Sequence, residues 1–219
     1  MKLAHFLLDL VFPPKCPFCE ALLDRQELLC PDCQRDLPWL TGSQGMRRVE
    51  LTEGCVSVLR YEGLVRNGVL GFKFRGKSAR SLPFGTLLAQ AVRDQWLVEK
   101  GEKPDLITWA CLSPRRLRQR GYDQAGLLCA QVGKLLDLKV VKTLKKQNRP
   151  PQSGIQGEGA RRANLMGAYV ALPRVHLQGK TVLLVDDVVT TGTTLSECAK
   201  ALRLAGASKV LCAAFARAG

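Results

Sequence analysis

The chain has 219 residues, 46% of them hydrophobic, and a formal net charge of +14. This length suffices for one full domain and a small one, and no apolar run approaches the ~20 residues that a transmembrane helix requires. The basic residues concentrate at 60–80 and 139–162. This clustering favours a polyanionic partner, either nucleic acid or a phosphorylated metabolite, and a solubilising basic surface is the alternative.

The first residues predict a short amphipathic helix. One helical face carries the apolar side chains Leu3, Phe6, Leu7, Leu10 and Val11. His5 and Asp9 interrupt the run and no small-residue cleavage site follows, so we expect no signal peptide and a cytoplasmic location. A helix packed on the domain behind it is the favoured interpretation, and an anchor at a membrane surface is the alternative.

Two Cys-x-x-Cys pairs predict a metal site. They are Cys16 with Cys19 and Cys30 with Cys33. Four thiolates at such spacing suit a tetrahedral structural Zn²⁺, whereas a redox dithiol needs only one pair. The other five cysteines stand alone in apolar or helical stretches and are expected to be buried. These five are Cys55, Cys111, Cys129, Cys198 and Cys212.

Residues 1–40 therefore form a predicted N-terminal unit of a helix and a four-cysteine zinc ribbon. A segment this short needs metal to fold. Between Cys16 and Cys33 the single basic residue is Arg25, against four acidic ones. We therefore expect a docking or structural module that does not grip phosphates. A loop rich in Gly, Ser and Arg follows, and residues 41–54 are predicted to be a linker.

Residues 55–219 predict an α/β domain, because strand patterns alternate with helix patterns. Strands are expected at 55–61 and 105–112, and a helix runs from Pro83 to Trp96 and stops near Gly101. A further helix is expected at 123–137, with Asp123 as its N-cap. The sheet should be mainly parallel, and ligands of such sheets lie beyond the carboxyl ends of the strands.

A basic loop is expected directly after the strand at 105–112. Its guanidinium groups suit a pyrophosphate. The alternative is an exposed basic turn without a ligand. The candidate pyrophosphate-binding residues are Arg115, Arg116, Arg118 and Arg120.

Residues 182–195 carry the clearest chemical signal. The apolar run 182–185 predicts a strand buried on both faces, and it leads directly into Asp186 and Asp187. A hydroxyl-rich loop and a helical pattern follow. A helix N-terminus binds phosphate well, and carboxylates suit sugar hydroxyls or Mg²⁺. This combination fits a ribose 5-phosphate. The candidate loop residues are Thr190, Thr191, Gly192, Thr193 and Thr194.

The alternative is a buried strand with Asp and Thr as ordinary turn and N-cap residues. The stretch resembles the phosphoribosyl pyrophosphate (PRPP) motif of type I phosphoribosyltransferases. The resemblance implies that Asp186 and Asp187 hold the ribose hydroxyls and act in catalysis. It also implies that the loop 190–194 holds the 5-phosphate.

The whole chain resembles the ComF family, which includes GntX-type proteins. The resemblance rests on the two cysteine pairs, the PRPP motif and three further segments, which are 61–63 leading to 73–76, 118–125, and a hood segment. The hood residues are Gln152, Arg162, Asn164 and 167–169. Asp123 departs from the family, where Asn is frequent. The family resemblance implies a cytoplasmic protein of natural competence, which handles incoming single-stranded DNA or uses DNA as a nutrient.

Three functions remain open. The chain could be an enzyme, a phosphoribosyltransferase or PRPP hydrolase that uses Mg²⁺, since such chemistry needs leaving-group stabilisation more than a general base. It could be a competence factor that binds single-stranded DNA, with Tyr61, Phe72, Phe74 or Tyr122 as stacking candidates unless they lie in the core. It could also be a regulator that senses PRPP without turnover. The acceptor, the oligomeric state and any partners in the competence machinery have no readable sequence signal.

Overall fold

The computed structural model describes residues 13–24, 26–147 and 167–219. The predicted N-terminal helix and the hood residues Gln152, Arg162 and Asn164 lie outside these ranges. No helix of the described chain combines the length and the apolar character needed to cross a bilayer.

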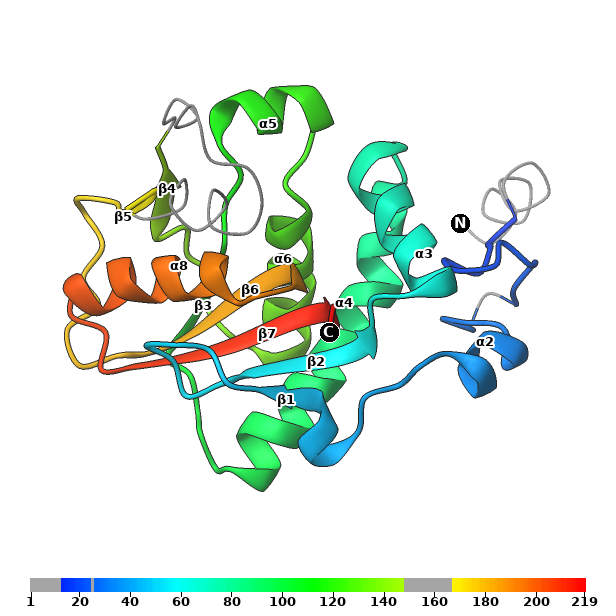
Figure 1. Ribbon diagram of the computed structural model, residues 1–219, viewed down its shortest axis with the longest axis horizontal. Coiled ribbons are helices and arrows are strands. Elements are labelled where there is room, and N and C mark those ends of the chain that lie inside the picture. The colour runs from blue at the N-terminus through cyan, green and yellow to red at the C-terminus, as the bar shows by residue number, and fades with distance from the viewer. Residues whose placement is uncertain (1–12, 25, 148–166) are drawn as a thin grey trace.

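A five-stranded sheet forms the centre of the molecule (Figure 1), in the order β1-β2-β7-β6-β3. Four strands run parallel and β1 runs antiparallel to β2. A second sheet pairs β4 with β5. The strands are β1 (Met46–Arg47), β2 (Cys55–Arg60), β3 (Leu106–Trp109), β4 (Leu144–Lys146), β5 (Tyr169–Ala171), β6 (Thr181–Val189) and β7 (Lys209–Arg217).

Helices cover both faces of the large sheet. The α-helices are α2 (Pro31–Asp36), α3 (Gly63–Phe74), α4 (Ser81–Val92), α5 (Pro114–Arg120), α6 (Gln124–Leu136) and α8 (Thr193–Leu204). Two 3₁₀ segments, η1 (Gly42–Gly45) and η2 (Ser78–Arg80), and a π-helical segment, η3 (Arg93–Glu99), complete the described helices.

Alternate residues of the central strands enter two different cores. Leu183 and Val185 of β6 pack with α3, α4 and α6, whereas Val182 and Leu184 pack with α8. All four are fully buried. A strand buried on both faces needs a continuous apolar run, which is why the unalternating run at 182–185 predicts β6 correctly. The five single cysteines are also buried, as expected.

Two local predictions were wrong. The acidic pair does not follow β6 but lies within it, because β7 is nine residues long and keeps pairing through Asp186↔Ala214 to Val189↔Arg217. The basic segment after β3 is the short helix α5 and not a loop. Ser113 caps it by accepting from the Arg116 N–H at 3.4 Å, and Gly121 ends it with φ +79°.

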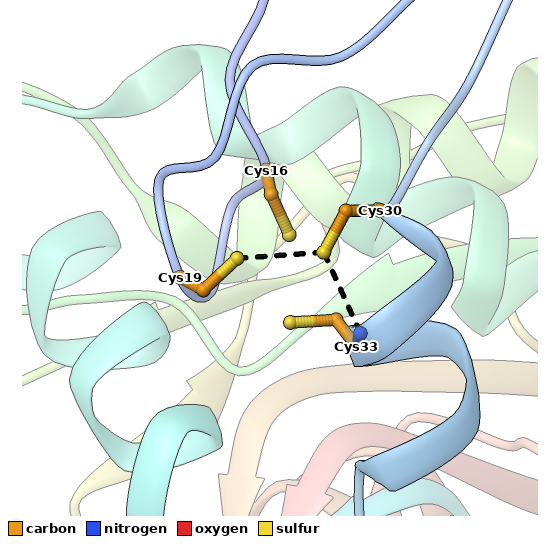
Figure 2. A group of neighbouring side chains, drawn as sticks. All are labelled: Cys16, Cys19, Cys30 and Cys33. Carbon is orange, nitrogen blue, oxygen red and sulfur yellow. Dashed lines mark hydrogen bonds between the residues drawn. The ribbon is translucent and has the colours of Figure 1, made fainter.

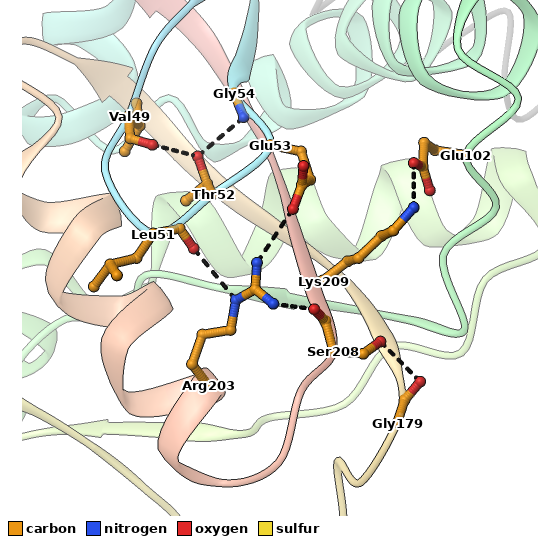
Figure 3. Close-up of polar contacts among 10 residues, drawn as sticks. All are labelled: Val49, Leu51, Thr52, Glu53, Gly54, Glu102, Gly179, Arg203, Ser208 and Lys209. Atoms are coloured by element: carbon orange, nitrogen blue, oxygen red, sulfur yellow. Dashed lines mark hydrogen bonds and ion pairs between the residues drawn. The ribbon is translucent and has the colours of Figure 1, made fainter.

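Residues 41–54 lie against the sheet and add β1 to its edge. Figure 3 shows the polar contacts between residues 49–54 and the C-terminal end of α8. Arg203 donates to the Leu51 carbonyl at 3.5 Å and to the Glu53 carboxylate at 3.2 Å. Thr52 Oγ1 donates to the Val49 carbonyl at 2.9 Å. These contacts fix Val49, which is 4% exposed and faces the loop before α8.

Asp123 ties the two ends of the basic segment together. Its Oδ1 accepts from the Gly126 N–H at 3.2 Å and so caps α6, as the sequence predicts. Its Oδ2 accepts from the Leu112 N–H at 2.9 Å and from Trp109 Nε1 at 3.2 Å. The segment that carries α5 therefore begins and ends at one carboxylate.

Replacing this carboxylate should destabilise the protein. Asp123→Ala removes the cap and leaves two partly buried donors without an acceptor, for a cost of about 2 kcal/mol. For a chain of this size that cost lowers Tm by about 4–8 °C in a thermal melt. Asp94→Ala removes an exposed carboxylate that accepts from Gln90 and should change Tm by no more than about 2 °C. Equal melting of both variants would contradict the structural role of Asp123.

Candidate functional site

Two carboxylates lie at the carboxyl end of β6, where parallel sheets place their ligands. Asp187 forms an ion pair with Lys73 of α3, with 2.7 Å between Oδ1 and Nζ. The two side chains are only 13% and 17% exposed. Asp186 Oδ1 accepts from the backbone N–H of Asp187 at 2.8 Å. The structure thus couples the predicted acidic pair to a lysine that is distant in sequence.

The pKa of the Asp186 carboxyl lies well above its ordinary value. Burial and, after it, the negative charge of Asp187 raise this pKa to about 8, whereas Lys73 and Lys146 oppose the shift. A bound cation or hydroxyl donors would stabilise the charged form of this carboxyl. Two carboxylate oxygen donors at one strand end also suit a hard cation such as Mg²⁺.

Of the predicted hydroxyl-rich loop 190–194 (the threonine loop), residues 190–192 join β6 to α8, and Thr193 and Thr194 form the first turn of α8. Gly192 holds φ +82° at the N-cap position, and a Cβ there would come within 3.2 Å of Val49 Cγ2. Two features therefore favour glycine at this position, the positive φ and the close approach of the Val49 side chain. Thr191 and Thr193 share a hydroxyl hydrogen bond of 2.8 Å. Gly192 offers no side-chain cap, and the Thr193 N–H donates to Thr191 Oγ1 at 3.5 Å. In the described chain the remaining first-turn N–H groups of α8 are therefore available to an anion.

The four predicted arginines do not act alike. Arg115, Arg116 and Arg118 are exposed on α5, and Arg120 is half-buried. Burial and, after it, the charge of Arg116 lower the pKa of Lys146. Arg120 instead lies 4.7 Å from the ring centroid of Phe74 and donates to Gln124 at 2.8 Å. Arg120 is therefore held against α3, whereas the other three arginines are exposed on α5.

Two lysines of the site were not singled out by sequence reasoning. Lys73 lies in the basic stretch 60–80, and Lys146 on β4 lies in the stretch 139–162. Lys146 donates to the Tyr169 hydroxyl at 2.9 Å, and burial lowers its pKa. The clustering of basic residues identified both stretches as possible anion-binding segments, without distinguishing single lysines. Only the tertiary arrangement selects these two, since it brings Lys73 of α3 to Asp187 and packs the β4–β5 pair against α8.

The second sheet is also tied to the helix after the threonine loop. Glu197 of α8 accepts from the backbone N–H of Gly167 at 2.5 Å, just before β5. Ala168 and Tyr169 are buried in the core that holds α8. The described part of the predicted hood, 167–169, therefore stands beside the site.

The four paired cysteines meet at one point (Figure 2). Their Sγ atoms all lie within 4.8 Å of one another, and the Cys19 and Cys30 sulfurs are 3.4 Å apart. Tetrahedral zinc with bonds of ~2.3 Å places sulfurs about 3.8 Å apart, so the cluster fits zinc. The Cys33 N–H donates to Cys30 Sγ at 3.5 Å, which orients that ligand at the start of α2.

The cysteine cluster belongs to the main core. Phe18, between Cys16 and Cys19, has ring centroids of Phe84 and Phe215 within 5.3 and 6.3 Å. A Cβ at Gly68 of α3 would come within 3.0 Å of the Phe18 ring and 3.2 Å of the Pro17 carbonyl. The ribbon therefore determines how α3 packs.

The aromatic candidates separate by burial. Phe72 is 1% exposed and lies in the core, so it offers no face for stacking. The half-buried Tyr122 donates its hydroxyl to the Phe72 carbonyl at 2.5 Å, and Tyr61 is half-buried. Phe74 is 63% exposed and is the free aromatic face among the four.

Comparison with known families divides the chain into two matched regions. Residues 7–45 match the double zinc ribbon domain, and residues 120–219 match the phosphoribosyl transferase domain. Residues 7–45 contain four cysteines and no histidine, which provides one four-cysteine set. The cluster and this match together support a structural zinc site.

Comparison with individual proteins gives relatives and a structural neighbour. Competence protein F of Haemophilus influenzae is 34% identical over 67% of this chain, and the match spans 65% of that protein, just under two thirds. DNA utilization protein YhgH of Salmonella typhimurium is 29% identical over 89% of this chain and 86% of its own. Among solved structures, glutamine phosphoribosylpyrophosphate amidotransferase from B. subtilis, complexed with ADP and GMP, is 25% identical. It covers 63% of this chain and 26% of its own, with a TM-score of 0.41.

The two domain matches stand in the order that the resemblance of the cysteine pairs and the acidic motif implies, and the curated relatives bear names from competence and DNA use. The chain belongs to the ComF family.

Proposed function

We propose that the chain binds PRPP with Mg²⁺ and acts in natural competence or the use of DNA. The observation that carries the proposal is the close succession of Asp186, Asp187 and the open N-terminus of α8 on one strand–loop–helix unit. A phosphoribosyl group presents a diol, which suits the two carboxylates, and a terminal phosphate, which suits the N-terminus of α8. The names of the relatives support the competence part of the proposal.

Each group of the site has a defined part in this proposal. Asp186 and Asp187 accept from the ribose hydroxyls, and the N–H and hydroxyl groups of 190–194 hold the 5-phosphate. Arg116 approaches the pyrophosphate with Arg115 and Arg118 beside it. Asp186 and Asp187 would hold Mg²⁺ together with PRPP, and the metal would supply charge stabilisation to the leaving group.

Turnover and sensing use the same pocket. In turnover, an acceptor or water forms a bond to C1 as the bond from C1 to the pyrophosphate oxygen breaks, and the acceptor's proton passes to solvent. A sensor binds PRPP without this step. Release of pyrophosphate in the presence of Mg²⁺ separates the enzyme from the sensor.

PRPP with Mg²⁺ should raise the Tm of the protein. At about 100 times Kd the gain is about 2.7 kcal/mol, or roughly 5–10 °C for this chain length. Asp187→Asn should abolish the rise. The rise should be larger at pH 8.5 than at pH 6.5, because the carboxyl of Asp186, with its pKa raised to about 8, must lose its proton to bind the ligand.

The matched control is Asp137→Asn, an exposed carboxylate after α6 in a backbone conformation that asparagine also adopts. It should keep the full ligand-induced rise. A wild-type protein that shows no rise at either pH would refute the phosphoribosyl site.

Single-stranded DNA is the second proposed ligand, favoured by one exposed aromatic. Phe74 stands free on the surface with the guanidinium of Arg120 over its ring at 4.7 Å. Aromatic faces flanked by arginine are stacking platforms for unpaired bases. Arg75, the next residue in the chain, is also exposed.

Binding of an oligothymidine should therefore weaken steeply with salt. Three phosphate contacts give a slope of about −2 in a plot of log K against log salt, measured by fluorescence anisotropy. Phe74→Ala should weaken binding by about 1–3 kcal/mol. Leu82→Ala, which truncates another exposed apolar side chain, is the control and should bind normally. Affinity that ignores both salt and Phe74 counts against the strand-binding role.

Zinc is proposed as the metal of the four-cysteine cluster. Purified protein should contain about one zinc per chain by mass spectrometry, and Cys19→Ser should lose most of it. Cys129→Ser, outside the cluster, should retain the metal whatever its effect on stability. Chelation should lower the Tm of the whole protein, because Phe18 lies among core aromatics. A metal-free chain with unchanged melting would refute the structural role.

A further inference from the structure

We propose that Lys73 is an exchangeable counter-ion, which holds Asp187 in the unliganded protein and moves to the pyrophosphate of PRPP when the ligand takes the carboxylates. This inference rests on the proposed function and deepens it. It names a residue that recognises the leaving group, on a helix that carries none of the residues predicted for the phosphoribosyl site.

The first step is the ion pair itself. Nζ of Lys73 and Oδ1 of Asp187 are 2.7 Å apart, and both side chains are largely withdrawn from water. Lys73 thus occupies the carboxylate that the proposal gives to a ribose hydroxyl or to Mg²⁺. A ligand can use Asp187 only if this ammonium gives way.

The second step is the movement of the Lys73 side chain, which the packing around α3 allows. The backbone on both sides of Lys73 is anchored, because the Phe72 carbonyl accepts from Tyr122 and the ring of Phe74 lies against Arg120. Val65 and Val69 hold the rest of α3 in the core. The helix therefore stays in place, and the four-carbon stem of the lysine makes the movement.

The third step is the destination. A largely buried ammonium that loses its carboxylate requires another anion nearby. The 5-phosphate is assigned to the N-terminus of α8. The pyrophosphate on C1 is adjacent to the 2-hydroxyl, and hence to the carboxylate that binds it. A lysine displaced from Asp187 thus lies beside the leaving group.

The proposed exchange predicts different effects of Lys73 on the binding of ribose 5-phosphate and of PRPP. Ribose 5-phosphate must displace Lys73 from Asp187 and offers no pyrophosphate in return. PRPP makes the same demand and satisfies the freed ammonium. Removing the charge of Lys73 should therefore weaken PRPP binding and should preserve or improve the binding of ribose 5-phosphate.

Calorimetry with Mg²⁺ present tests this prediction on wild type, Lys73→Met and Arg66→Met. Arg66 is exposed on the same helix, so its variant is a matched loss of charge. We expect Lys73→Met to weaken PRPP binding at least tenfold while ribose 5-phosphate binds as well as before or more tightly. Arg66→Met should leave both affinities unchanged. Equal losses for both ligands, or no loss for PRPP, would overturn the exchange.

A second readout needs no ligand and separates this inference from the proposed function. In thermal melts without ligand, Lys73→Met and Asp187→Asn should change Tm non-additively in the double variant, because the two side chains form one ion pair. Lys73→Gln replaces Lys73→Met if the first variant folds poorly. Additive changes overturn the counter-ion role. Coupled changes in a protein that binds no PRPP would keep the ion pair and refute the phosphoribosyl site.

Discussion

Two adjacent carboxylates at a largely buried strand end impose the main constraint on this molecule. Burial disfavours their charges, and each carboxylate raises the cost of the other. The protein meets this cost with lysines from two separate elements, Lys73 on α3 and Lys146 on β4. These lysines partly offset the negative charge of the two carboxylates and place positive charge where we propose that a phosphorylated ligand binds.

Local pattern predicted most of the central fold. The buried run before Asp186 predicted β6, and Asp123 was correctly identified as the N-cap of α6. Both signals depend on residues close in sequence. The extent of β6 could not be predicted in the same way, because β7 determines how far the strand continues. The Ser113-Pro114 start and Gly121 stop of α5 were present in the sequence, but the run of arginines favoured a loop interpretation.

The site itself was predictable only in part. The motif at 186–194 gave the carboxylates and the threonine loop as neighbours. It could not select Lys73 or Lys146, since many other lysines and arginines lie in the same basic stretches. Among the four arginines, sequence spacing gave no means to separate the three that are exposed on α5 from Arg120, which lies against Phe74. Such distinctions depend on tertiary packing between elements far apart in the chain.

The contact between Phe18 and Gly68 has a consequence for how such proteins can diverge. The aromatic ring fills a space that the glycine leaves open, so the first forty residues cannot be exchanged freely between relatives as an independent module. A descendant that lost its cysteines would still require an apolar plug over Phe84 and Phe215. Conversely, a bulkier residue at position 68 would require a smaller one at position 18. The two positions should therefore change together across lineages, even where the metal is gone.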